Sequence, residues 1–156
     1  MKKSDIPNGF TIVELLIVVA LIAIMASFAT PAWMHYAENS DLKTATRVII
    51  ADITQTRQRA IAENTSAYQI TFNYSNNSYS LSRSDTGVTL WTKKLTDYGK
   101  KNVLWFSWID EGNILKFTRR GTMKDGYIWV RNSFYSYSLI YVRMIGRPYA
   151  YYYLEK

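Results

Sequence analysis

Glu14 is the residue whose chemistry is least expected at its position, because its carboxylate lies inside a long apolar run. The twenty residues from Phe10 to Ala29 are apolar except for Thr11, Glu14 and Ser27. A charged side chain in a membrane-length segment costs roughly 3 kcal/mol, so such residues usually have a functional partner. We therefore take Glu14 as a candidate ion-pairing site. The alternative is a solvated, inert carboxylate near the membrane surface.

A second group of residues suited to chemistry lies toward the C-terminus, where cations alternate with aromatic side chains. This composition is typical of surfaces that contact phosphates and stack on bases. It also fits a strand face on which tyrosines pack and arginines point into solvent. The net charge of +7 favours anionic partners without identifying one. The candidate DNA-binding residues are Arg131, Arg143, Arg147 and Tyr149.

The residues needed for catalysis or metal binding are not assembled in this sequence. The chain has no cysteine, which excludes zinc-thiolate and cysteine-nucleophile chemistry. Its one histidine, His35, is expected on a helix surface. The acidic turns at 110–113 and 125–126 lack the spacing of a calcium loop. We expect no enzyme activity, no cofactor and no metal.

The element that must position Glu14 is a helix long enough to cross a bilayer. Twenty residues at about 1.5 Å each span roughly 30 Å. Lys2 and Lys3 precede this run, so the positive-inside tendency places the N-terminus in the cytoplasm and the remainder outside it. Two alternatives stay open: signal-peptide cleavage near 26–29, and a simple uncleaved anchor.

Helical character continues beyond Pro31, where a kink is expected because proline lacks a backbone donor. No glycine or proline occurs from Met34 to Glu63. Apolar or small residues recur there at three- and four-residue spacing and predict a buried stripe. The stripe comprises Leu42, Ala45, Ile49, Ile53, Thr56 and Ala60, and the charged residues, Asp52 among them, mostly fall off it. The sequence predicts one helix of about 50 residues.

After Asn64-Thr65-Ser66 the pattern changes to short β-rich runs between turn formers. Strands are predicted at 68–74, 79–82, 88–95, 103–108, 114–118, 127–131, 139–145 and 149–154. The expected fold is α+β, a long N-terminal helix with a transmembrane first half, packed on a small antiparallel β-sheet domain. We divide the chain into 1–9, 10–30 as the membrane helix, 31–64 as its amphipathic continuation, and 65–156 as the β-rich domain.

The run Phe10-Thr11-Ile12-Val13-Glu14-Leu15-Leu16 after Gly9 resembles the signal of type IV pilins and type II secretion pseudopilins. This resemblance implies a leader peptide, residues 1–9, removed by prepilin peptidase after Gly9. It also implies N-methylation of Phe10. Glu14 would then pair with the new terminal amine of its own or a neighbouring subunit and fix register in a filament.

Within that superfamily, the rest of the chain resembles the H-type minor pseudopilins and the FimT-like minor pilins. The segment Thr54–Asn64 is similar to their Ala-Arg-x-x-Ala-Ile-x-x-Asn helix end, and Gly146-Arg147 resembles their closing turn. Some FimT-like proteins bind DNA through Gly-Arg-x-Arg. Here Pro148-Tyr149 follows, so the second arginine is absent.

The resemblance implies a minor pilin or pseudopilin, a structural subunit in the bacterial inner membrane and, after assembly, in a filament. Expected partners are other pilin subunits, prepilin peptidase, the inner-membrane assembly platform, membrane lipid and DNA. A filament subunit, a DNA-binding minor pilin for DNA uptake and a membrane-tethered module without a filament role remain the three functional classes.

Overall fold

The computed structural model describes residues 10–99, 101–109, 113–145 and 147–155. Its internal contacts divide the chain into two units, Met1–Met34 and His35–Lys156. We refer to these as the N-terminal unit and the C-terminal unit. The proposed leader with Gly9, most of the acidic turn at 110–113 and Gly146 of the Gly-Arg turn lie outside the described residues.

A single helix, α1, runs over Ile12–Ala62 for 51 residues, which confirms the predicted long helix. It ends where Asn64 adopts a left-handed backbone conformation, φ 49°. The Thr65 amide donates to the Ala60 carbonyl at 3.0 Å and the Asn64 amide to the Ile61 carbonyl at 3.1 Å. These two bonds form a Schellman cap, which satisfies carbonyls that the last turn leaves open. The predicted helix end is therefore confirmed.

Pro31 lies inside α1, and the kink there stays a prediction. Within the described residues, no single helix meets the length and hydropathy required of a membrane span. The stretches Ile12–Ser27 and Pro31–Ala62 meet that requirement together, as a broken pair. A transmembrane segment at 10–30 is thus still a prediction.

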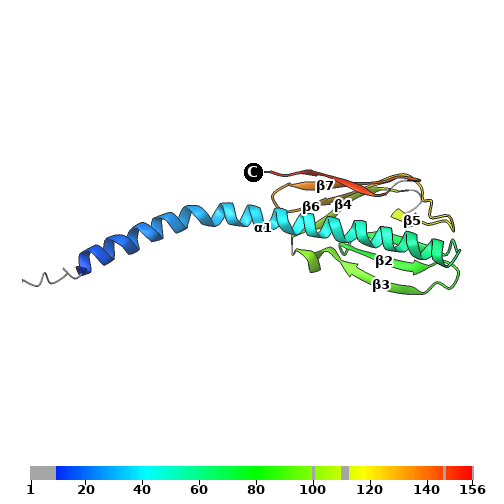
Figure 1. Cartoon of the computed structure of the whole chain (residues 1–156), viewed down its shortest axis with the longest axis horizontal. Helices are drawn as coiled ribbons and strands as arrows, with labels where there is room; N and C mark the ends of the chain where they lie inside the picture. The colour runs from blue at the N-terminus through cyan, green and yellow to red at the C-terminus, as the bar shows by residue number, and fades with distance from the viewer. Residues whose placement is uncertain (1–9, 100, 110–112, 146, 156) are drawn as a thin grey trace, which may run out of the picture. The chain divides into compact units, whose positions relative to one another are not determined.

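The C-terminal unit contains the second part of α1 and two four-stranded antiparallel sheets, which confirms the predicted α+β fold (Figure 1). Sheet A has the order β3-β2-β1-β5 and sheet B the order β4-β6-β7-β8. Sheet A comprises β1 (Tyr68–Asn73), β2 (Ser78–Arg83), β3 (Thr89–Lys94) and β5 (Ile114–Lys116). Sheet B comprises β4 (Val103–Trp108), β6 (Gly126–Arg131), β7 (Tyr137–Val142) and β8 (Tyr149–Tyr153). The short 3-10 helix η1 (Leu95–Tyr98) lies between β3 and β4, which are consecutive in the chain but belong to different sheets.

Strand β7 differs most from its predicted range, 139–145. It begins at Tyr137, which pairs with Arg131, and ends at Val142, which pairs with Gly126. Beyond that point the Met144 amide donates to the Asp125 side chain. The Met144 carbonyl in turn accepts from the Met123 amide, so irregular contacts replace the ladder beyond Val142.

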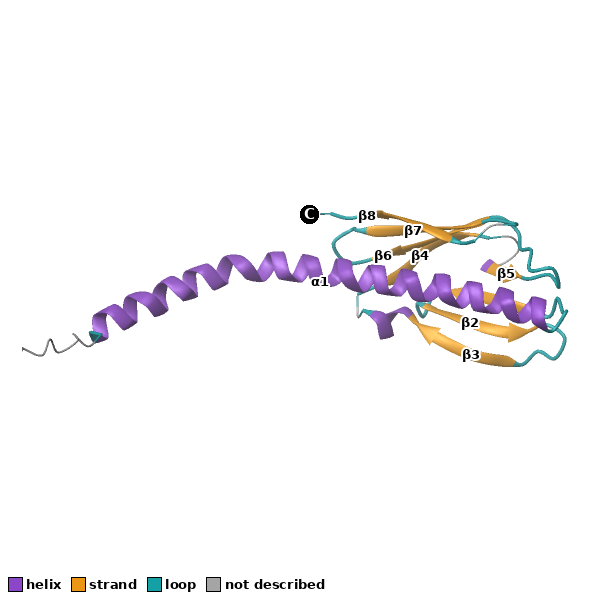
Figure 2. Cartoon of the chain, in the orientation of Figure 1, coloured by secondary structure: helices purple, strands orange, loops and turns teal. Residues whose placement is uncertain are grey.

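The core joins the second part of α1 to both sheets (Figure 2). Every residue of the predicted stripe is buried, with exposure of 1% or less. These side chains pack against residues such as Ile70 and Leu81 from sheet A and Ile128 and Ile140 from sheet B. The amphipathic prediction for this part of the helix is confirmed, because one helical face supplies a common core to two sheets.

Asp52 corrects the prediction that the charges mostly fall off the stripe, since its side chain is buried. The Tyr79 hydroxyl donates to Asp52 Oδ2 at 2.6 Å, and the Lys93 ammonium lies 2.8 Å from both carboxylate oxygens. A buried carboxylate is tolerated when it is paired and hydrogen-bonded in this way. Burial and then the Asp52 hydrogen bond raise the pKa of Tyr79, so its hydroxyl stays a donor.

Candidate functional site

The start of α1 positions Glu14 through a reciprocal pair of hydrogen bonds with Thr11. The Thr11 amide donates to Glu14 Oε2 at 2.9 Å, and the Glu14 amide donates to Thr11 Oγ1 at 3.2 Å. The Thr11 hydroxyl also lies 3.0 Å from Glu14 Oε2. This arrangement is a capping box, which satisfies amides that have no partner within the helix. The Thr-x-x-Glu spacing is the sequence signal that could have indicated it.

The same carboxylate therefore has a local partner in the uncleaved chain. Phe10, the residue before the cap, is 86% exposed. Gly9 lies outside the described residues, so the structure does not test the cleavage site. Pairing of Glu14 with a Phe10 amine requires cleavage of the 9–10 bond, because only then does that amine exist.

The outer side of sheet B carries most of the predicted cationic and aromatic site. Along β6, Ile128 and Val130 are buried in the core, while Tyr127, Trp129 and Arg131 alternate with them and are half-buried. Because side chains alternate across a strand, the latter three share the face away from the core. The cross-strand partners of these residues extend that face over β7 and β8.

Ring contacts connect these side chains across the strands. Trp129 stacks on Tyr137 with ring centroids 5.5 Å apart, and Tyr137 stacks on Tyr153 at 4.6 Å. Tyr127 meets Tyr141 edge to face at 4.8 Å. We call this surface the aromatic face. It comprises Trp105, Trp108, Tyr127, Trp129, Tyr137, Tyr141, Tyr149, Tyr151 and Tyr153.

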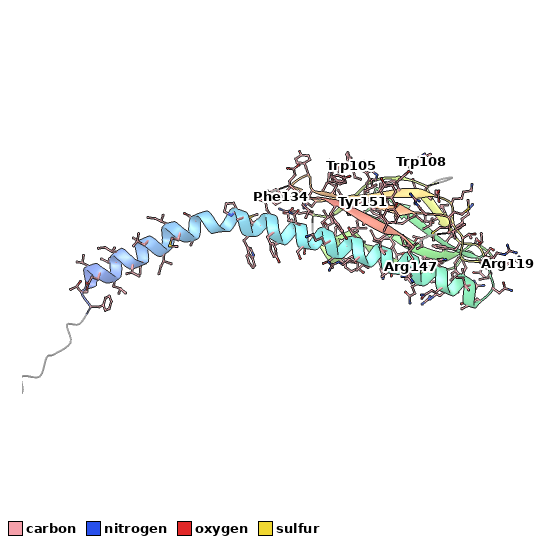
Figure 3. All side chains as sticks on the ribbon, turned by 45° about the horizontal axis from the view of Figure 1, so that its top comes forward. Trp105, Trp108, Arg119, Phe134, Arg147 and Tyr151 are labelled. Atoms are coloured by element: carbon pink, nitrogen blue, oxygen red, sulfur yellow. The ribbon has the colours of Figure 1, made fainter. Side chains whose placement is uncertain are left out.

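Exposure of the aromatic face is high at its borders. Trp108 is 64% exposed and Tyr151 is 54% exposed (Figure 3). Burial and then the neighbouring tyrosine hydroxyls raise the pKa of Tyr141. Tyr141 therefore presents a neutral hydroxyl at physiological pH.

Three of the four predicted DNA-binding residues lie on or beside the aromatic face. Arg131 lies over the Trp105 ring at 4.8 Å and over Tyr135 at 5.3 Å. Arg143 lies over Tyr149 at 5.9 Å. Tyr149 also stacks on Tyr141 at 5.2 Å. These are cation–π and stacking contacts that hold the guanidinium groups against the sheet.

Arg147 is exposed between β7 and β8. The arginines at 119–120 are exposed between β5 and β6, and the Arg119 amide donates to Ser66 Oγ. No contact joins these two arginines to the aromatic face among the interactions of the described residues. The sequence groups Arg147 with Arg131 and Arg143, whereas the described structure shows ring contacts to the aromatic face for Arg131 and Arg143.

A groove of about 380 Å³ opens on the aromatic face and was not predicted from the sequence. We call it the central groove. It is lined by Trp108, Tyr127, Trp129, Leu139 and Tyr141. Leu139 is 8% exposed and pairs across the sheet with Trp129 and Tyr151. An aliphatic side chain among larger rings leaves this space open.

His35 is half-buried and stacks on Phe134 with centroids 3.8 Å apart, so the expectation of a helix-surface residue is only partly correct. Its Nδ1 atom is buried without a hydrogen-bond partner. Among the residues that the structure describes, no three His, Cys, Asp or Glu side chains are placed to hold a metal ion. His35 is therefore described as a packing residue.

The start of α1, which contains the capping box, is similar in sequence to known proteins. Residues 7–30 match the model of the prokaryotic N-terminal methylation motif. The type IV major fimbrial protein FimA of Dichelobacter nodosus is 44% identical over 61 residues, which are 39% of this chain and 35% of FimA. These matches show that the N-terminal part of the chain is similar to that of type IV pilins. The α+β fold of the chain, a long N-terminal helix on antiparallel sheets, is the fold expected of a pilin.

A second similar protein, described as a fimbrial protein of the same organism, is 46% identical over 61 residues, which are 35% of its length. The matched residues cover about a third of the length of each of these relatives. No solved structure matches significantly. The matches to these relatives cover 39% of this chain.

Proposed function

We propose that this chain is a structural subunit of a type IV filament, stored as a membrane-anchored precursor and assembled after cleavage behind Gly9. The observation that carries this proposal is the match to the methylation motif over an apolar helix whose side chains are exposed. From Ile12 to Met25 the large apolar side chains are between 45% and 79% exposed. Such a surface needs an apolar environment.

Lipid and the helices of neighbouring subunits can each provide this apolar environment, one after the other. Before assembly, lipid would surround this stretch, and Lys2 and Lys3 would keep the N-terminus in the cytoplasm with the C-terminal domain outside. In a filament, the same stretches of neighbouring subunits would replace the lipid. Moving from lipid to like helices conserves apolar contacts, so extraction from the membrane becomes feasible.

Glu14 would give the assembled helices their register. An unpaired carboxylate in an apolar bundle is strongly disfavoured, whereas a carboxylate beside the Phe10 amine is tolerated. The cap formed by Thr11 holds the carboxylate at the helix start until that amine is created. We infer that Glu14 changes partners on maturation.

We propose a minor subunit, of a pilus or of a type II secretion pseudopilus, because of the resemblance at Thr54–Asn64. The similar proteins from Dichelobacter nodosus are described as major fimbrial proteins or simply as fimbrial proteins, so this finer assignment rests on that resemblance alone. Proposed partners are other pilin subunits, prepilin peptidase, the assembly platform and inner-membrane lipid. The role is structural, and no catalytic activity is proposed.

Mass spectrometry of the protein isolated from its native host tests the proposal. The expected N-terminus is N-methylated Phe10. An intact Met1, or a terminus near 26–29, would refute it. A Gly9→Ala variant should accumulate as the full-length precursor, while a Ser4→Ala variant, altered within the same leader, should be processed normally.

DNA binding for uptake is the second candidate function, and a specific observation favours it. The fold brings Arg131, Arg143 and Tyr149 to one side of sheet B, next to a large aromatic surface. Cations beside exposed rings fit a phosphate backbone with unpaired bases. Anisotropy titration with labelled DNA tests this function, and an Arg131→Ala and Arg143→Ala double variant should weaken binding.

A further inference from the structure

The central groove lies between the two arginines of the aromatic face. Arg131 closes one end of the β6–β7 pair, opposite Tyr137. Arg143 follows Val142, which pairs with Gly126 at the other end. These two ends are five residue steps apart, or roughly 17 Å at about 3.4 Å per step. Two cations therefore flank a space lined by rings.

The chemistry of the groove favours a flat, unsaturated ring as its occupant. Its lining consists of four aromatic side chains and Leu139, with no charged group. The volume of about 380 Å³ lies at the lower end of the range for small-ligand sites, roughly 300–1,000 Å³. Trp129, which stacks on Tyr137, also lines the groove. A planar ring that enters would extend an existing row of stacked rings.

The number of cations indicates which form of nucleic acid fits. Proteins that bind a duplex through its backbone often make roughly 6–10 phosphate contacts. The aromatic face offers two arginines, Arg131 and Arg143. Base stacking must then supply much of the affinity, and in a duplex the faces of the bases are already stacked on one another. Unpaired bases do not have this obstacle.

We propose that the aromatic face is a binding site for single-stranded nucleic acid, with a base in the central groove and flanking phosphates at Arg131 and Arg143. This proposal rests on the second candidate function, DNA binding, and is independent of filament assembly. It names the form of the ligand and the residues that contact its bases.

The test uses the full chain in detergent micelles and two fluorescent probes, an oligothymidylate and a duplex of equal length. Anisotropy across a salt series should show single-strand binding about tenfold tighter than duplex binding. With about 0.7 of a unit of slope per phosphate, two contacts predict a log–log salt slope near −1.4. The Arg131→Ala and Arg143→Ala double variant should flatten that slope.

Two variants address the groove without removing a cation. Leu139→Phe fills it, and Trp108→Ala removes an exposed wall residue. Each should weaken single-strand binding about tenfold. Trp33→Ala, which removes a 71% exposed tryptophan from α1, is the matched control and should bind as the parent does. If Leu139→Phe fails to fold by circular dichroism, Trp108→Ala still decides the question.

Three results would overturn the proposal: duplex binding as tight as single-strand binding, parental affinity in both groove variants, or displacement of the oligonucleotide by a neutral oligosaccharide. Duplex binding that depends on Arg131 and Arg143 would leave the broader DNA-binding function intact. If neither probe binds at low salt, both the single-strand proposal and the broader DNA-binding function are refuted. Methylation of Phe10 and filament incorporation are measured separately and would be unaffected.

Discussion

Helix α1 contains two stretches that differ in what surrounds their apolar side chains. In the N-terminal unit, Ile17 and Leu21 are both more than half exposed. In the C-terminal unit, Ile49 and Ile53 are at most 1% exposed. Secondary structure is the same in both, so helix formation alone does not create a buried core. The second stretch finds its partners within the chain, whereas the first must find them in another molecule or in lipid.

The carboxylates of the two stretches show the same contrast. Asp52 has partners from distant strands, Tyr79 and Lys93. Within the described residues, the Glu14 carboxylate accepts its hydrogen bonds from Thr11, one turn away. A carboxylate with tertiary partners belongs to the folded domain. We infer that a carboxylate with only a local cap can exchange it for a partner from another subunit.

The largest effect is expected from Glu14→Gln. The side-chain amide of glutamine keeps an oxygen that can accept the hydrogen bonds of the helix cap. It carries no charge, so it cannot form an ion pair with the Phe10 amine. Incorporation into filaments, measured by immunoblotting of sheared filaments from cells, should fall to background.

Thr11→Ala is the matched control because it removes the capping hydroxyl and keeps the carboxylate. Loss of a cap costs only about 1 kcal/mol, so incorporation should stay close to that of the parent. Equal failure of both variants would show that Glu14 acts through the cap and not through its charge.

Asp52→Ala should produce the largest loss of folding stability in the C-terminal unit, about 3 kcal/mol, because it leaves a buried hydroxyl and a partly buried ammonium without their acceptor. Guanidinium unfolding followed by circular dichroism measures it. Asp85→Ala removes a surface partner of Arg83 and should leave the unfolding midpoint unchanged. Similar midpoints for the two variants would contradict the assigned role of Asp52.

Ile53→Ala and Ile17→Ala compare the two stretches by the same change of side chain. At the buried position, loss of packing and the resulting cavity should cost about 2–3 kcal/mol. At the exposed position, the unfolding midpoint of the C-terminal unit should not move. A shift caused by Ile17→Ala would mean that the first stretch also supports the fold of the sheets.

The smallest effect concerns Glu38, which pairs with Lys101 at 2.6 Å and accepts a hydrogen bond from Ser133. Burial alone would raise the pKa of Glu38, but these partners together lower it below its ordinary value. A lowered pKa stabilises the fold at neutral pH, and that contribution is lost as pH falls below about 4.3. Glu38→Gln should reduce the acid sensitivity of the melting temperature between pH 5 and pH 3. An identical pH profile would contradict this role.

Local periodicity explains how much of the fold could be predicted. The 3.6-residue stripe through Leu42 and Ile49 and the alternation in strands such as Tyr68–Asn73 depend only on neighbouring residues. The division into two sheets could not be predicted this way. It depends on β4 pairing with β6 and not with β3, a choice between segments that have similar patterns.

The candidate sites divide in the same manner. Glu14 and its motif were evident because every residue involved lies within one short segment. The burial of Asp52 was not evident, because its partner Tyr79 lies 27 residues away in the chain. The central groove was not evident either, because its lining residues come from three strands, β4, β6 and β7. The Thr11–Glu14 cap is local and could have been identified, but it was not.

The buried hydroxyl pair Thr46–Ser138, 2.6 Å apart, joins residues 92 positions apart in the chain. Synthesis makes the helix first and sheet B last, so the side of the stripe that packs on sheet B stays uncovered until β7 emerges. Closing so long a loop is slow relative to local folding. Until the last strands are made, that side of the stripe is an apolar surface on which premature association can begin.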